Sequence, residues 1–129
     1  MTPRRLLLVF VGGSIGTAVR LAVELWMPDA GGFPTATLLV NVVGSLLIGV
    51  VAARLASTAG VRVFLGTGVL GGFTTYSAFM TGTVVLWADA PLLAFVYAAG
   101  SLVLGLAAAA LGLRLGRPRR SAPRAGADA

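Results

Sequence analysis

The sequence predicts an all-α membrane protein with four transmembrane helices, of which the third is broken near mid-membrane. Composition is the first reason: 57% of the 129 residues are hydrophobic and only 11% are charged, whereas a soluble domain carries roughly a quarter charged residues. Secondly, the apolar residues form four runs, each long enough for the roughly 20 helical residues that cross a bilayer. Thirdly, glycines and threonines interrupt the third run. Lipid is therefore the expected solvent.

The four predicted spans are separated by residues that favour turns. The first covers about residues 6–27 and ends at the segment PDAGGFP, which is rich in proline, glycine and aspartate. The second covers about 35–56. The third covers about 61–87 and ends at ADAP, whose Pro91 suits the first turn of the next helix. The fourth covers about 92–115.

The spans are expected to form one four-span domain over residues 1–115, with no internal repeat and no second domain. Residues 116–129, GRPRRSAPRAGADA, are polar and contain proline, so we expect a disordered basic tail there. The start of the chain, MTPRRLLLVFVGG, could also be a secretory signal, with basic residues before an apolar run. Three more apolar runs follow it, and we therefore interpret it as the first span.

Arginine placement predicts the orientation of the chain. Four spans put both termini on one side; nine of the ten arginines fall there, whereas the opposite loops carry two aspartates and no arginine. The nine are Arg4, Arg5, Arg54, Arg62, Arg114, Arg117, Arg119, Arg120 and Arg124. This bias predicts a multi-pass protein of the cell membrane that inserts N-in and C-in. The basic tail is better explained by contact with lipid headgroups than with nucleic acid.

Missing residue types exclude several kinds of chemistry. The chain contains no cysteine and no histidine. Disulfides, zinc sites, haem ligation and thiol or imidazole catalysis are thereby excluded. No span or loop gathers a nucleophile and a base, so an enzyme is not expected.

The first span carries two glycines and a charged residue on one helix face. Gly12, Gly16 and Arg20 are spaced by four residues. The glycines would let another helix approach closely. Arg20 would be carried toward the end of the helix away from the termini, where it can snorkel and pair with Glu24. Two interpretations stay open: a packing seam with an ion pair, or an arginine that gives a positive potential to the mouth of an anion path.

The second and fourth spans each carry a stripe of small and polar residues. In the second, Asn41 is the informative member. A single asparagine in a span often only hydrogen-bonds a neighbouring helix, but its amide could also donate to a passing anion. The stripe of the fourth span is interpreted mainly as a packing ridge, and Ser101 is a candidate to line something polar. That ridge comprises Ser101, Gly105, Ala108 and Gly112.

The third span contains the segment GGFTTYSAF, residues 71–79, where a continuous helix is disfavoured. The four glycines between Gly66 and Gly72 weaken a helix, and Thr74 and Thr75 can bond to backbone carbonyls. A break there would expose carbonyls that suit a hard monovalent cation and amides that suit an anion. The simpler alternative is a flexible, glycine-rich packing helix.

Two aromatic residues follow this break. Tyr76 and Phe79 are three residues apart and fall on one face of the second half-helix. Their ring edges carry positive partial charge and can face an anion without a formal cation. They could equally be ordinary aromatic filler.

Three motifs together resemble one family. GGFTTYSAF resembles the GGxTTFSTF signature of the Fluc/CrcB family of fluoride channels. GGSIGTAVR matches the family's glycine-rich first span ending in arginine, and PTATLLVNVVGSLLIG resembles its second span. The motifs occur in the family's order on a four-span chain, and the resemblance covers nearly all of residues 3–115.

The resemblance implies a passive, fluoride-selective channel that lowers cytoplasmic fluoride and works as an antiparallel dimer with a structural sodium ion, Na+, at its centre. It implies that the backbone carbonyls of Gly71 and Thr74 hold this sodium, and that Arg20 lies near a vestibule. The residues expected along or beside the fluoride path are Asn41, Tyr76, Phe79, Thr75, Ser77 and Ser101.

Some features depart from the family pattern. Tyr76 stands where the family usually has phenylalanine, Ala78 where it has threonine, and Leu21 follows Arg20 where an aromatic residue is usual. The one-sided arginines are the most informative departure, because an antiparallel homodimer needs one sequence that inserts both ways. We therefore expect a heterodimer with an oppositely oriented paralogue, with a homodimer as the alternative.

Two rival functions are compatible with four spans. A small proton-coupled multidrug exporter would need a carboxylate in the middle of the first span, whereas Glu24 is near the end of that span beside Arg20. A non-conducting membrane subunit would explain the glycine seams but not the break in the third span.

Overall fold

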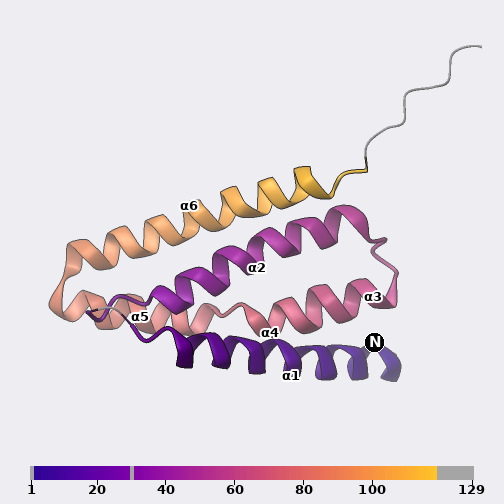
Figure 1. The fold of residues 1–129 in the computed structure, drawn as a ribbon, viewed down its shortest axis with the longest axis horizontal. Helices are drawn as coiled ribbons and strands as arrows, with labels where there is room; N and C mark the ends of the chain where they lie inside the picture. The colour runs from indigo at the N-terminus through magenta and orange to yellow at the C-terminus, as the bar shows by residue number, and fades with distance from the viewer. Residues whose placement is uncertain (1, 30, 119–129) are drawn as a thin grey trace, which may run out of the picture.

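The computed structural model describes residues 2–29 and 31–118, and its elements are all helices (Figure 1). In chain order they are α1 (Pro3–Trp26), α2 (Thr35–Arg54), α3 (Gly60–Arg62), the π-helical segment η1 (Val63–Leu70), α4 (Gly71–Phe73), α5 (Tyr76–Asp89) and α6 (Pro91–Gly116).

Four helical stretches are long and apolar enough to cross a membrane, as the sequence predicted. They are α1, α2, the series of segments over Gly60–Asp89, and α6. Pro91 begins α6, in agreement with its expected place in the first turn. The helix runs to Gly116, so it includes the first residue of the predicted disordered tail. Residues 119–129 of that tail lie outside the described part of the chain.

The third crossing is interrupted at Thr74 and Thr75, which separate α4 from α5. Both residues are extended, with φ −79° and ψ 152° at Thr74 and φ −145° and ψ 119° at Thr75. The predicted break is therefore present. The π-helical turns of η1 before it were not predicted. At the end of η1 the Gly71 amide reaches the carbonyls of both Gly66 and Gly68.

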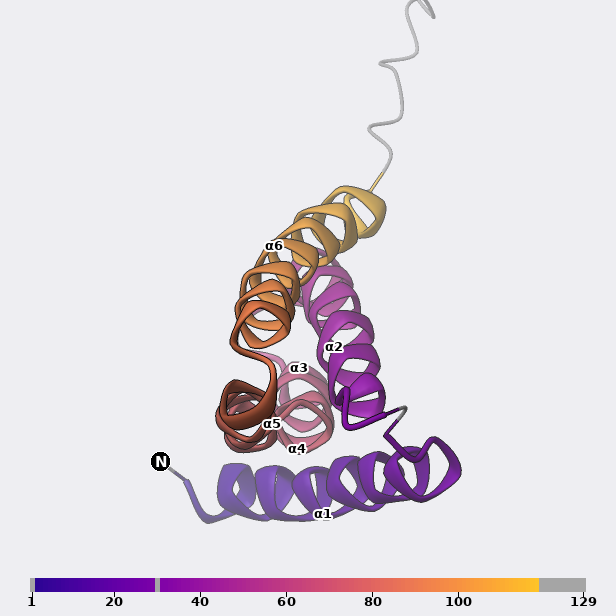
Figure 2. The same cartoon turned by 90° about the vertical axis from the view of Figure 1, so that its left-hand side faces the viewer.

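The third crossing lies between α1 on one side and the α2–α6 pair on the other, and both views show this order (Figure 1 and Figure 2). Its first half packs on α1, and its second half, α5, packs on α6. Away from the termini, a small core forms around Leu86, Ala94 and Tyr97. This arrangement places the break between α1 and the α2–α6 pair, with Thr74 and Thr75 half-buried.

Glycines make the closest helix contacts possible. A Cβ atom on Gly12 would lie 2.7 Å from the carbonyl oxygen of Phe64, and one on Gly16 would overlap the carbonyl oxygen of Val69. The glycine seam expected in the first span therefore holds α1 against the third crossing. A Cβ on Gly112 would likewise overlap the carbonyl oxygen of Leu46, so the ridge of the fourth span packs on α2 there.

Replacing Gly16 by alanine is expected to lower the free energy of unfolding by about 1–3 kcal/mol, because the added methyl group must push α1 away from Val69. Chemical denaturation of the purified protein in detergent measures the change. Gly100→Ala is the matched control, since a Cβ at Gly100 meets no atom within 4 Å. Equal stability of the two variants would contradict close packing at Gly16.

Candidate functional site

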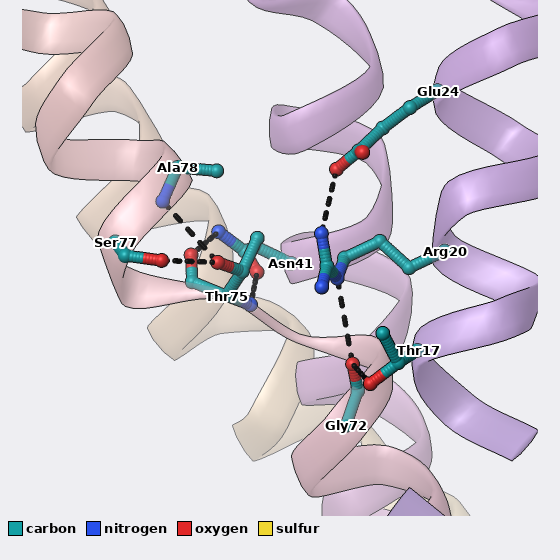
Figure 3. Close-up of polar contacts among 8 residues, drawn as sticks. All are labelled: Thr17, Arg20, Glu24, Asn41, Gly72, Thr75, Ser77 and Ala78. Carbon is teal, nitrogen blue, oxygen red and sulfur yellow. Dashed lines mark hydrogen bonds and ion pairs between the residues drawn. The ribbon is translucent and has the colours of Figure 1, made fainter. Parts of the chain in front are cut away.

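The side chain of Asn41 is bonded to the backbone at the break. The Thr75 amide donates to Asn41 Oδ1 at 2.8 Å, and Asn41 Nδ2 donates to the Thr75 carbonyl at 3.0 Å (Figure 3). An asparagine on α2 therefore supplies the partners that a continuous helix would have supplied. Nδ2 carries two hydrogens, and this pair uses one. Asn41 thus hydrogen-bonds a neighbouring helix, as one of its two interpretations predicted, and its second N–H has no acceptor among the described residues.

Several backbone carbonyls lose their helical partners at the break, those of Gly71 and Thr74 among them. In a continuous α-helix the Thr75 amide would bond to the Gly71 carbonyl, and the Ala78 amide to the Thr74 carbonyl. Here the Thr75 amide bonds to Asn41, and the Ala78 amide bonds to Thr75 Oγ1 at 3.2 Å. The carbonyls of Gly71 and Thr74, the predicted sodium ligands, are therefore among those released at the break, together with the carbonyls of Gly72 and Phe73.

The carbonyl of Gly72, between these two, has partners from α1. Thr17 Oγ1 donates to it at 3.3 Å and Arg20 Nε at 3.4 Å (Figure 3). The same guanidinium forms an ion pair with Glu24, with Nη1 and Oε1 3.0 Å apart. The expected ion pair is therefore present, and Arg20 also holds the end of the first half-helix.

Thr75 is the N-cap residue of α5. Its Oγ1 accepts from the Ala78 amide and lies 3.1 Å from Ser77 Oγ (Figure 3). This cap fixes the start of the second half-helix. It also places two hydroxyls beside the positive end of the α5 dipole, where an anion is favoured.

A cavity of about 390 Å³ lies between α2, the break, α5 and α6. It brings together five residues predicted for the fluoride path: Asn41, Thr75, Tyr76, Phe79 and Ser101. Thr74 also lines it, and the rest of its wall is mainly aliphatic. Ser77 lies beside it through Thr75, whereas Arg20 and Gly71 are not among the lining residues. The wall therefore offers uncharged polar groups on an apolar surface.

Aromatic rings continue from this cavity into the core. The ring centroids of Tyr76 and Phe79 are 6.0 Å apart, those of Phe79 and Tyr97 5.7 Å, and those of Tyr97 and Phe33 5.4 Å. Tyr76 is 75% exposed at the mouth of the cavity. The pair is therefore the outer end of a row of rings, and whether it also faces an anion stays a prediction.

Tyr97 is a polar residue that the sequence analysis missed. It is 2% exposed, and its hydroxyl has no hydrogen-bond partner among the described residues; neither does the buried hydroxyl of Ser101. The signal available in the sequence was the spacing, because Tyr97 precedes Ser101 by four residues and so shares its helix face. Ser101 lines the first cavity, whereas the Tyr97 hydroxyl lies near Gly82 of α5 and Tyr97 is not part of that lining.

A second cavity, of about 380 Å³, lies near the loop between α1 and α2. Its lining includes the carboxyl residues Glu24 and Asp29 and the hydroxyl residues Thr37 and Thr81. Carboxylates near this cavity distinguish it from the first one.

A family model described as "CrcB-like protein, Camphor Resistance (CrcB)" matches residues 7–113. The chain belongs to this family. It is 43% identical over 112 residues to fluoride-specific ion channel FluC 2 of Bacillus subtilis, an alignment that covers 84% of this chain and 85% of that relative. Identity to the FluC of Agrobacterium fabrum is 47% over 117 residues, covering 85% and 94%. Identity to the FluC of Thermus thermophilus is 43% over 122 residues, covering 90% and 96%.

The family that the three motifs indicated is thereby confirmed. In this CrcB-like chain the first-span, second-span and third-span motifs supply Arg20, Asn41 and Thr75, and all three bond at or beside the interruption. The motifs are therefore different parts of one site.

Replacing Asn41 by leucine in this CrcB-like chain is expected to cost about 1–2 kcal/mol of unfolding free energy, because the Thr75 amide and carbonyl both lose their partner. Thermal unfolding in detergent measures the effect. Ser45→Ala is the control, since Ser45 lines the same cavity from the same helix. A leucine variant as stable as this control would show that the interruption does not need the amide.

Proposed function

We propose that this chain is a passive, selective fluoride channel of the cell membrane that lowers cytoplasmic fluoride. The observation that carries the proposal is the 43–47% identity, over most of the chain, to proteins named fluoride-specific ion channel FluC. The protein is an ion channel and not an enzyme. The interrupted third crossing and its uncharged cavity support this function, because they place hydrogen-bond donors inside the bundle.

The chemistry of the cavity suits a small, strongly hydrated anion. A pore for such an ion must replace its water with several weak donors, and binding must be weak enough for the ion to leave. No carboxylate and no arginine belong to the described lining, so the ion is neither repelled nor trapped by a formal charge. The candidate donors are the free N–H of Asn41, the hydroxyls of Thr75, Ser77 and Ser101, and the ring edges of Tyr76 and Phe79.

The structural sodium fits the carbonyls of Gly71 and Thr74. Both lack the amide partner of a continuous helix, and carbonyl oxygens suit a hard cation. Among residues 2–29 and 31–118 no cluster of acidic side chains offers a rival site. Two carbonyls are few for a cation, so a second subunit would add two more at the centre of an antiparallel dimer.

One-sided charge supports a heterodimer with an oppositely oriented paralogue. The N-terminus, the α2–α3 connection and the end of α6 lie at one end of the bundle (Figure 1), and nine arginines belong to this side of the sequence. This bias favours N-in and C-in insertion alone. Two relatives, from Bacillus subtilis and Nitrobacter hamburgensis, carry the name FluC 2, as expected where paralogues occur.

In proteoliposomes that contain the assembly that carries fluoride efflux, either the chain alone or the chain with its paralogue, Phe79→Ala is expected to slow this efflux at least about tenfold, because it removes a ring of the cavity wall. A fluoride electrode measures the rate, and chloride efflux checks selectivity. Phe95→Ala, on the exposed face of α6, is the control. If Phe79→Ala releases fluoride at the wild-type rate, the Phe79 ring does not line the fluoride path. Proton-dependent dye export would instead indicate a multidrug exporter. Absence of both fluoride efflux and dye export, with every partner tested, would indicate a non-conducting subunit.

The heterodimer predicts that the purified chain alone releases little fluoride, and that co-expression with a paralogue of opposite charge bias restores release. A reporter fused to the C-terminus should lie on the cytoplasmic side in nearly all molecules. If the chain alone forms antiparallel dimers that pass fluoride, the homodimer is correct instead.

A further inference from the structure

A full positive charge reaches the backbone segment between the two proposed sodium ligands. Arg20 Nε is 3.4 Å from the carbonyl oxygen of Gly72, and Gly72 lies in the chain between the two proposed sodium ligands, Gly71 and Thr74. The contact is useful because it satisfies a carbonyl that the break would leave without a partner. An uncompensated guanidinium would also repel a cation held by the neighbouring carbonyls.

Glu24 offsets this charge. Its Oε1 is 3.0 Å from Arg20 Nη1, and the two side chains are only 29% and 22% exposed, so solvent screens them incompletely. Among the described residues this is the only ion pair, and no other carboxylate pairs with Arg20. The pair brings a neutral, hydrogen-bonding group to Gly72 in place of a net charge.

We infer that Glu24 is a positioning residue for the structural cation: by neutralising Arg20 it allows the guanidinium to hold the Gly72 carbonyl without weakening sodium binding at Gly71 and Thr74. The inference rests on the sodium site of the proposed function. It assigns Glu24 a role on the cation side of the break, away from the cavity proposed for fluoride, whose lining does not include it.

The test is a sodium titration of thermal stability on the assembly that carries fluoride efflux, either the chain alone or the chain with its paralogue. Sodium chloride replaces N-methylglucamine chloride at constant ionic strength. Glu24→Gln should raise the sodium concentration for half-maximal stabilisation about tenfold, because an unpaired guanidinium remains beside the cation. Asp29→Asn is the matched control: it removes the same charge from the loop that follows α1, and Asp29 makes no ion pair among the described residues.

A second comparison keeps the test decisive if Glu24→Gln does not fold. Arg20→Gln leaves Glu24 unpaired and should lower the sodium midpoint, and the double variant Arg20→Gln/Glu24→Gln should return it toward the wild-type value. If the two single variants shift the sodium midpoint in opposite directions and the double variant restores it, the role of Glu24 is supported.

If Glu24→Gln and Asp29→Asn need the same sodium concentration for half-maximal stabilisation, the inference is overturned and the sodium site is unaffected. A wild-type protein whose stability ignores sodium would overturn the sodium site and the inference together. Fluoride efflux from the same preparation distinguishes that failure from loss of the channel function itself.

Discussion

The reciprocal pair between the amide of Asn41 and the backbone of Thr75 is the interaction on which the site depends. A helix interrupted inside a membrane leaves polar backbone groups where no bulk water can satisfy them. Asn41 satisfies an amide and a carbonyl with one side chain, at 2.8 and 3.0 Å. The same bond diverts the Thr75 amide from the Gly71 carbonyl. A single contact therefore stabilises the interruption and leaves the Gly71 carbonyl oxygen without its helical partner.

The rest of the bundle brings neighbouring helices to this point. Gly12 and Gly16 let α1 lie against the third crossing closely enough for Thr17 and Arg20 to reach the Gly72 carbonyl. On α2, a Cβ at Gly44 would overlap the Thr74 side chain, so that glycine gives the break its space. Close backbone approach and polar satisfaction are therefore coupled, because the short side chains of the seams allow the longer ones to reach their partners.

The four crossings and the break in the third could be predicted from the sequence, and the features that could not be predicted share physical causes. Hydropathy reveals spans because lipid demands long apolar helices, and glycine and β-branched residues mark the break because they weaken a helix. The partner of Asn41 could not be predicted, since Thr75 is 34 residues away on another crossing. Tyr97 was missed because a helix that is apolar all round gives no periodicity from which to choose its inner face. The π-helical turns of η1 depend on a hydrogen-bond register that its glycines permit but do not dictate.

The two unsatisfied hydroxyls on α6 have an energetic consequence. A buried hydroxyl without a partner costs about 1–3 kcal/mol, and Tyr97 and Ser101 each carry one. Hydroxyl protons rotate, so each group can turn to meet either an acceptor or a donor. These groups are thus a place where α6 gives up stability to keep polar atoms inside the bundle.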